Sequence, residues 1–183
     1  LAGDRADLVV LAVDGAVHAV QAASVSGQPV ESLDGARRLR EVTVEVSDGT
    51  LVSDDPAAVT ALWDRGAWAA AAQAVGVAQR LLDLTVAYVA EREQFGRPVG
   101  VNQAVKHHCS NVAIAVEFAR PMVQTAAWAL ANGRAPEATI PPGATGAAGP
   151  STLVSMAKAM ASDAVDLACR SALQCHGAIG YTV

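Results

Sequence analysis

Apolar residues recur in alternating steps of four and three along much of this chain. This spacing places them on one face of an α-helix and is typical of helices that pack in a bundle. Stripes of apolar residues with this spacing lie near residues 77–88 and residues 153–171, and a longer one lies between them. Three helices are therefore predicted, over about 57–92, 102–131 and 151–176. The longest stripe comprises Val105, Cys109, Val112, Val116, Ala119, Val123, Ala126 and Leu130.

Residues that favour helix ends flank these stripes. Asp55-Pro56 predicts the start of the first helix, because aspartate caps well and proline suits the first turn. Asn132-Gly133 predicts the end of the second helix. Ser151-Thr152 is expected to cap the third helix, which is expected to stop at Gly177.

Strand patterns dominate residues 1–53. An apolar run over residues 7–13 leads into Asp14-Gly15, a strong two-residue hairpin signal. Valines at 42, 44 and 46 alternate with polar residues, which predicts a strand with one buried and one wet face. The predicted fold is therefore α+β: residues 1–53 form part of a β domain, and residues 54–183 form an up-down helical bundle.

Composition excludes several classes of function. The chain has 183 residues, of which 52% are hydrophobic and only 4% aromatic, as expected of close-packed helices. A net charge of -5 argues against nucleic-acid binding. No uninterrupted apolar stretch is long enough to span a membrane, and the first residues lack a signal-peptide pattern.

The cysteines and histidines show no metal-binding spacing. The three cysteines form no CxxC pair, and the adjacent His107 and His108 point in different directions from one helix. No metal site is predicted. Buried, reduced thiols and a cytoplasmic location are the expectation.

Two polar motifs stand out at helix ends. Arg92 and Phe95 lie at the end of the first predicted helix, just before the sequence Gly-Arg-Pro. A guanidinium binds phosphate oxygens with a planar fork, and a ring can stack on another ring, so the pair suits a nucleotide. Far downstream, Gln174 and Gly177 follow the third helical stripe. Taken alone, the first motif is more simply explained as an ordinary solvated helix end, and the glycines of the second are also compatible with simple helix termination.

These strings resemble the acyl-CoA dehydrogenase family. The first is YVAEREQFGRPVGVNQAVKHH, beginning at Tyr88, and the second is QCHGAIGY, beginning at Gln174. The resemblance covers the second half of the family's middle β domain and most of its C-terminal bundle. It does not cover the family's N-terminal helical domain. It implies FAD as cofactor.

The resemblance also implies which residues bind FAD. Arg92 and Phe95 match positions that touch the FAD of a neighbouring subunit, and Asn102 and Gln103 open the next helix against the cofactor. Gln174, Gly177 and Ala178 match the motif around the adenine end. The family usually has a second glycine where this chain has Ala178.

The activity implied is α,β-desaturation of an acyl-CoA thioester, with electrons passing to an electron-transfer flavoprotein. That reaction needs a carboxylate to take the α-proton. Gly66 occupies one of the two family positions for this base, and the nearby Asp64 lies about 200° round the helix. The catalytic residue is therefore unknown. Ala67 also replaces an arginine that meets the CoA phosphates in many members.

The sequence leaves several interpretations open. The chain is a non-catalytic subunit that completes a partner's FAD site, or a self-sufficient dehydrogenase whose base lies beyond Val183. A helical-bundle scaffold without flavin and an acyl-CoA oxidase are also compatible with these residues. The expected assembly is a homo- or hetero-oligomer, such as a dimer of dimers. Residue usage favours a bacterial source, with fatty acid or steroid degradation as the setting.

Overall fold

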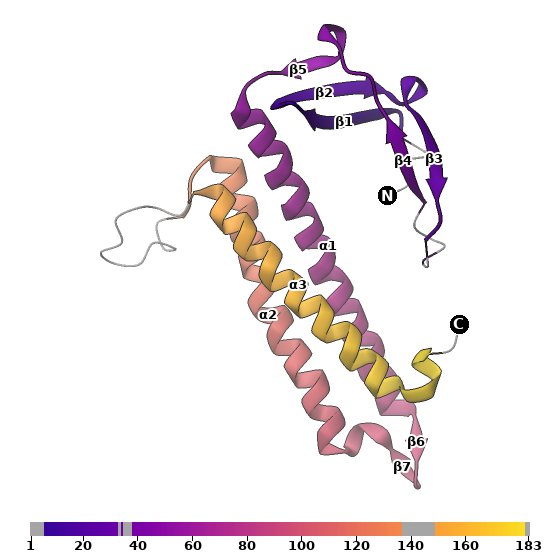
Figure 1. Cartoon of the computed structure of the whole chain (residues 1–183). Coiled ribbons are helices and arrows are strands. Elements are labelled where there is room, and N and C mark those ends of the chain that lie inside the picture. Colours follow the sequence, from indigo (N-terminus) through magenta and orange to yellow (C-terminus); the bar gives the residue numbers. More distant parts are fainter. Residues whose placement is uncertain (1–5, 33, 35–37, 137–148, 182–183) are drawn as a thin grey trace. The chain divides into compact units, whose positions relative to one another are not determined.

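The computed structural model describes residues 6–32, 34, 38–136 and 149–181. The chain divides into two compact units, Leu1–Trp63 and Asp64–Val183 (Figure 1). Small antiparallel sheets occupy the first unit, and long helices make up most of the second. The α+β class predicted from the sequence is confirmed.

A β-hairpin begins the first unit. Strands β1 (Leu8–Val13) and β2 (Ala16–Gln21) pair in antiparallel register. Asp14 and Gly15 between them have φ angles of 50° and 81°, as the tight turn of a two-residue hairpin requires. Strand β5 (Leu51–Ser53) pairs with the other edge of β2. The predicted hairpin is confirmed.

A second pair of strands corrects the prediction for residues 42–46. Strand β3 (Ser26–Val30) pairs with β4 (Leu39–Thr43), so the strand begins earlier and ends before Val44. Most of β4 is exposed on both faces within this chain. The alternation at Val42, Val44 and Val46 therefore did not identify a strand with a buried face. The segment after it forms a short 3₁₀ helix, Asp48–Thr50.

The long helices begin and end at recognisable capping residues. Helix α1 spans Pro56–Glu91, and the Asp55 carboxylate accepts a hydrogen bond of 2.9 Å from the Ala57 amide. Helix α2 spans Gln103–Asn132 and ends at Gly133, whose φ of 66° is left-handed. Helix α3 spans Pro150–His176 and ends at Gly177.

The start of α3 differs from the prediction. Gly149 is the N-cap and makes no side-chain capping bond, so Ser151 and Thr152 already lie inside the helix. The Ser151 hydroxyl instead donates a hydrogen bond of 2.5 Å to the Asp64 carboxylate on α1. Proline at the first helical position starts the helix because its fixed φ suits that position. The Ser151 hydroxyl, which was expected to cap α3, is therefore used in the contact with Asp64.

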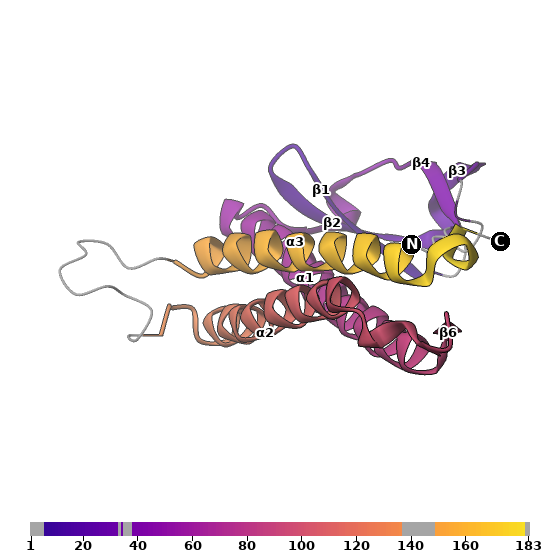
Figure 2. The ribbon, with the colours of Figure 1, turned by 90° about the horizontal axis from the view of Figure 1, so that it is seen from below.

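Alanine governs the packing of α2 against α3. The two helices lie side by side in both views (Figures 1 and 2). Small side chains permit this close approach of the backbones. Because the packing is dense, adding or removing even one methyl group is expected to change the stability. The fully buried alanines of these two helices are Ala119, Ala126, Ala129, Ala157, Ala161, Ala164 and Ala168.

Helix α1 completes the core with the fully buried Ala71 and Ala78 and with several larger side chains. Val75 is buried, and the half-buried Trp68 and Leu81 pack against the cluster. The Trp68 indole donates a hydrogen bond of 3.1 Å to the Val123 carbonyl, which ties α1 to α2. Among the described residues, no helix is long and apolar enough to cross a membrane.

Candidate functional site

The connection between α1 and α2 forms a short hairpin that carries the first motif. Strands β6 (Glu93–Gln94) and β7 (Arg97–Pro98) pair across a turn at Phe95 and Gly96. Both turn residues have positive φ, 54° and 76°. Phe95 is fully exposed in this chain, with a relative exposure of 101%. A left-handed backbone at a bulky residue is uncommon and is typical of functional sites.

Two arginines of this hairpin have different surroundings. The Arg97 guanidinium donates to the Asn102 side-chain oxygen at 3.2 Å, and the Asn102 amide donates to the Val99 carbonyl at 3.0 Å. Asn102 is the N-cap of α2, yet its side chain makes no capping bond because the hairpin uses it. The Arg92 guanidinium, in contrast, has no hydrogen-bond or ion-pair partner within the described ranges of the chain.

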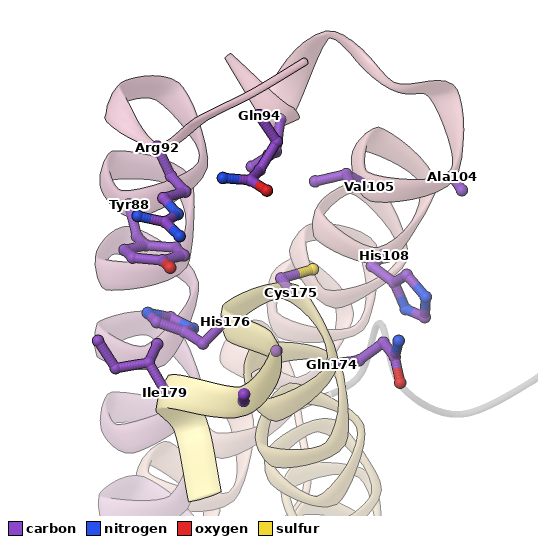
Figure 3. Close-up of a pocket in the computed structure, with 13 residues that line it drawn as sticks. Tyr88, Arg92, Gln94, Ala104, Val105, His108, Gln174, Cys175, His176 and Ile179 are labelled. Atoms are coloured by element: carbon purple, nitrogen blue, oxygen red, sulfur yellow. The ribbon is translucent and has the colours of Figure 1, made fainter. Parts of the chain in front are cut away.

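A polar cavity of about 390 Å³ lies between the ends of the three helices (Figure 3). Helix α1 and the hairpin contribute Arg92, and the end of α3 contributes Gln174. Arg92, Gln94 and His176 gather near α1, whereas His108 and Gln174 lie toward α2. The lining residues are Tyr88, Arg92, Gln94, Val99, Ala104, Val105, His108, Gln174, Cys175, His176, Gly177, Ala178 and Ile179.

Contacts with α1 and α3 hold the His176 ring in place. Its ring stacks on Tyr88 with centroids 4.3 Å apart and an interplanar angle of 18°. Its Nδ1 lies 2.8 Å from the Ala172 carbonyl. Since a carbonyl only accepts, Nδ1 carries a proton and donates this bond. The stack joins α1 to α3 at the cavity.

The cavity suits an anionic ligand with polar edges. One guanidinium, two imidazoles and two carboxamides line it, and none of its lining residues is Asp or Glu. An unpaired Arg92 is free to bind oxyanions through its planar fork. Burial, then the neighbouring Cys109 thiol, raises the pKa of the Cys175 thiol from 9.0 to about 11. Cys175 is therefore a neutral thiol at neutral pH.

The structure brings four of the seven predicted cofactor residues to this cavity. These are Arg92, Gln174, Gly177 and Ala178. The other three, Phe95, Asn102 and Gln103, lie outside its lining in this single chain. Their role toward the cofactor stays a prediction.

Sequence reasoning did not single out the aromatic and imidazole residues of this cavity. Tyr88 precedes Arg92 by four residues, and residues so spaced share a helix face. That spacing could have identified Tyr88. His176 lies inside the second motif without a role of its own there, and the sequence argument considers His108 only to exclude it as a metal ligand. Nothing in the sequence indicates that α2 and α3 bring these two histidines to one cavity.

The position matching a family base lies elsewhere in the bundle. Gly66 is an ordinary helical residue of α1, and a Cβ added there would meet no atom within 4 Å. Asp64 is occupied by the hydrogen bond from Ser151. Neither residue lines the polar cavity. Among the described residues, no group of three or more His, Cys, Asp or Glu could hold a metal ion.

Comparison with known proteins identifies the family. Residues 57–183 match the family described as "Acyl-CoA dehydrogenase, C-terminal domain". The chain belongs to the acyl-CoA dehydrogenase family. The acyl-CoA dehydrogenase IpdE2 of Mycobacterium tuberculosis is 34% identical over 180 residues, which are 98% of this chain and 48% of that protein.

Solved acyl-CoA dehydrogenase structures resemble this chain over both of its units. A glutaryl-coenzyme A dehydrogenase in complex with glutaryl-CoA matches with a TM-score of 0.79 and 25% identity, over 98% of this chain and 47% of that one. The ChsE4–ChsE5 complex from Mycobacterium tuberculosis matches with a TM-score of 0.76 and 25% identity, over 98% and 47%. The chain therefore spans about half the length of the relatives that it matches.

Proposed function

We propose that this chain is a subunit of a FAD-dependent acyl-CoA dehydrogenase that desaturates an acyl-CoA thioester between its α and β carbons. The observation that carries the proposal is the convergence of Arg92 and Gln174 on one cavity without carboxylates. About eighty residues separate the two in sequence. Both belong to the motifs that resemble the family's flavin-facing segments.

Three residues of the cavity have a defined role in this proposal. The Arg92 guanidinium binds the pyrophosphate of FAD, and the Gln174 carboxamide hydrogen-bonds the adenosine half. Gly177, with a φ of 64°, turns the backbone so that α3 ends beside the cofactor. Bound FAD supplies the hydride acceptor for desaturation. An electron-transfer flavoprotein then accepts the electrons.

We further propose that the site is completed across a subunit interface. Phe95 and the turn that carries it project from the end of the bundle, and an exposed aromatic ring at that place suits contact with a neighbouring protomer. Asn102 supports the hairpin through Arg97. Gln103, at the first position of α2, lies where backbone N–H groups favour anions. The likeness to a two-subunit complex, ChsE4–ChsE5, supports this arrangement.

The chain does not provide a base at the Gly66 position. Asp64 is held by Ser151 and lies outside the cavity, so it is poorly placed to replace one. We propose that this chain is the non-catalytic subunit and that a partner provides the carboxylate. The competing hypothesis, a self-sufficient enzyme with its base beyond Val183, predicts activity of the protein without a partner.

Reconstitution tests both parts of this proposal. The chain is purified alone and together with candidate partner subunits, and each preparation is measured for bound flavin and for acyl-CoA-dependent dye reduction. Flavin with dye reduction only in the mixed assembly is the expected result. Dye reduction by this protein alone overturns the non-catalytic role.

Two further readouts separate an oxidase and a scaffold from a dehydrogenase. A colourless assembly, even after refolding with FAD, overturns the cofactor assignment and supports a scaffold. Peroxide production with oxygen, in place of dye reduction, supports an acyl-CoA oxidase.

A further inference from the structure

Two cysteines from different helices meet in the wall between the polar cavity and a neighbouring apolar cavity. Cys175, near the end of α3, lines the polar cavity, and Cys109 of α2 lines the apolar one. The Cys175 sulfur points away from Arg92, toward the helix that carries His108 (Figure 3). Both cysteines are half-buried. Each is therefore within reach of a small reagent that enters its own cavity.

The two cysteines continue the buried stripes by which α2 and α3 face each other. Cys109 precedes the buried Val112 by three residues, and Cys175 follows the buried Ala172 by three. Residues with this spacing share a helix face. Packed helices have axes about 8–10 Å apart and Cα atoms about 2.3 Å from each axis, so facing Cα atoms are about 3–6 Å apart. A disulfide needs a Cα separation of about 4.4–6.8 Å, which this packing can supply.

The side chains of the pair also touch. Burial, then the charge of Cys109 and a hydrogen bond to its side chain, raise the pKa of Cys175 from 9.0 to about 11. Cys175 therefore keeps its proton when it faces a Cys109 thiolate. A thiolate is the form of cysteine that attacks an oxidant, and a second thiol beside it can then close a disulfide.

We propose that Cys109 and Cys175 form an oxidation site, at which a hydroperoxide converts the two thiols into a disulfide that links α2 to the end of α3. The Cys109 thiolate attacks the peroxide, so that an S–O bond forms, the O–O bond breaks and the leaving oxygen takes up a proton. The Cys175 thiol then attacks the oxidised sulfur; the S–S bond forms, the S–O bond breaks, and hydroxide leaves with the Cys175 proton as water. Two electrons pass in total from the thiols to the hydroperoxide.

Cys169 provides an internal reference on the same helix as Cys175. It is exposed, and six residues separate the two cysteines. In a helix this spacing means about 9 Å of rise and about 120° between the side chains, so the folded helix prevents a link between them. In the unfolded chain the preference reverses, because the short loop between Cys169 and Cys175 closes more readily than the long one between Cys109 and Cys175.

The test identifies which cysteines pair when the purified chain is oxidised. The reduced protein is treated with hydrogen peroxide, the remaining thiols are alkylated, and the protein is digested with trypsin without reduction. The cysteines lie in separate tryptic peptides, which begin at His107, Ala159 and Ser171, so mass spectrometry distinguishes all pairings. In the folded protein the Cys109–Cys175 link is expected to exceed either other pairing by roughly tenfold or more, because contact raises the effective concentration of the partner thiol.

Oxidation in denaturant is the matched control for the role of the fold. The same peptide map is then expected to show mainly the Cys169–Cys175 link, since loop length alone decides the pairing. Absence of a Cys109–Cys175 link in the folded protein overturns the inference, and so does the same pattern of pairing with and without denaturant. The proposed function is unaffected by either result, because the test does not involve FAD.

Two substitutions separate the steps of the oxidation. Cys175→Ser leaves the Cys109 sulfur without a thiol to close the disulfide, so a sulfenic acid is expected to accumulate and its labelling by dimedone to rise several-fold. Cys169→Ser is the control and is expected to retain the link. Unchanged dimedone labelling in Cys175→Ser, or loss of the link in Cys169→Ser, contradicts the assigned order of steps. The peptide map of the wild-type protein decides whether the link forms independently of any variant.

Discussion

Two cavities flank the hairpin at the end of α1, and they differ in how many polar side chains line them. The polar cavity that contains Arg92 has a volume of about 390 Å³, and a second cavity has about 430 Å³. The second is almost wholly apolar, with Lys106 as its one charged residue among those described. Its lining comprises Val86, Val89, Ala90, Pro98, Gly100, Val101, Val105, Lys106 and Cys109.

Helical periodicity explains why residues close to one hairpin line two different cavities. Tyr88 of α1 and Arg92, which directly follows the helix, are four residues apart and share a face, while Val86 and Val89 lie on another. Val105 on α2 lines both cavities. Most of the polar side chains thus lie on the side where the end of α3 arrives. A polar cavity of this kind requires a ligand or water to satisfy its donors, whereas the apolar one does not.

The largest expected difference between the two cavities is in the reactivity of their cysteine thiols. Cys175 lines the polar cavity, and the Cys109 thiol that it contacts lines the apolar one. A pKa of about 11 rather than 9.0 gives Cys175 a roughly hundredfold smaller thiolate fraction at neutral pH. Alkylation with iodoacetamide, followed by peptide mass spectrometry, is expected to label the exposed Cys169 well before Cys175. Cys109→Ala removes a neighbouring thiol and should accelerate labelling of Cys175.

The same shift predicts how stability depends on pH. The pKa of Cys175 is higher in the folded protein than its ordinary value, so folding favours the protonated thiol. Its contribution to stability is complete below about pH 9 and is lost as the pH rises through about 11. Denaturant unfolding across that window should show a smaller loss for Cys175→Ala than for the wild type. An equal loss would show that the thiol is not linked to folding.

Removal of the Arg92 guanidinium should weaken ligand binding in the polar cavity and leave the stability of the fold unchanged. Arg92→Met is expected to weaken FAD binding about ten- to thirtyfold, because a charge-assisted hydrogen bond contributes about 1.5–3 kcal/mol and Arg92 is exposed. The midpoint of thermal unfolding should change little, since Arg92 has no partner among the described residues. Equilibrium dialysis with FAD measures the effect. Arg97→Met should weaken binding by less than about threefold, and equal effects of the two variants would contradict the distinction between the arginines.

A methyl group at Gly100 should disturb the packing around the apolar cavity. A Cβ at Gly100 would lie 2.8 Å from the backbone oxygen of Val89, so the 3₁₀ turn Val99–Val101 that follows the hairpin must move away from α1. Gly100→Ala is expected to lower the free energy of unfolding by about 1–3 kcal/mol, as overpacking commonly does. Denaturant titration followed by circular dichroism provides the measurement. An unchanged midpoint would mean that the turn at Val99–Val101 does not pack closely on α1.

The smallest effect is expected far from both cavities. Gly66 lies within α1, where an added Cβ meets no atom within 4 Å. Gly66→Ala should raise the free energy of unfolding by about 0.5–1 kcal/mol, because glycine weakens a helix interior. FAD affinity and cysteine labelling should remain as in the wild type. A change in either would show that α1 transmits strain to the cavities.

Local sequence signals determined the helices and the first hairpin of this protein. Asp14-Gly15 demands a left-handed turn, and Asn132-Gly133 provides a left-handed helix end; both features depend on neighbouring residues only. The alternation at residues 42–46 failed, because strand bounds depend on which partner strand is available. Ser151 likewise does not cap α3, since Asp64 on α1 takes its hydroxyl.

The candidate site shows the same division between local and distant causes. The sequence by itself determined the family, most of the helix ends and the two motifs that contain Arg92 and Gln174. Only the tertiary structure decided that His108 and His176 share a cavity with Arg92, and that Phe95, Asn102 and Gln103 lie outside its lining. The physical reason is that helix periodicity fixes which face a side chain occupies. Which faces then meet depends on packing between helices that are far apart in the sequence.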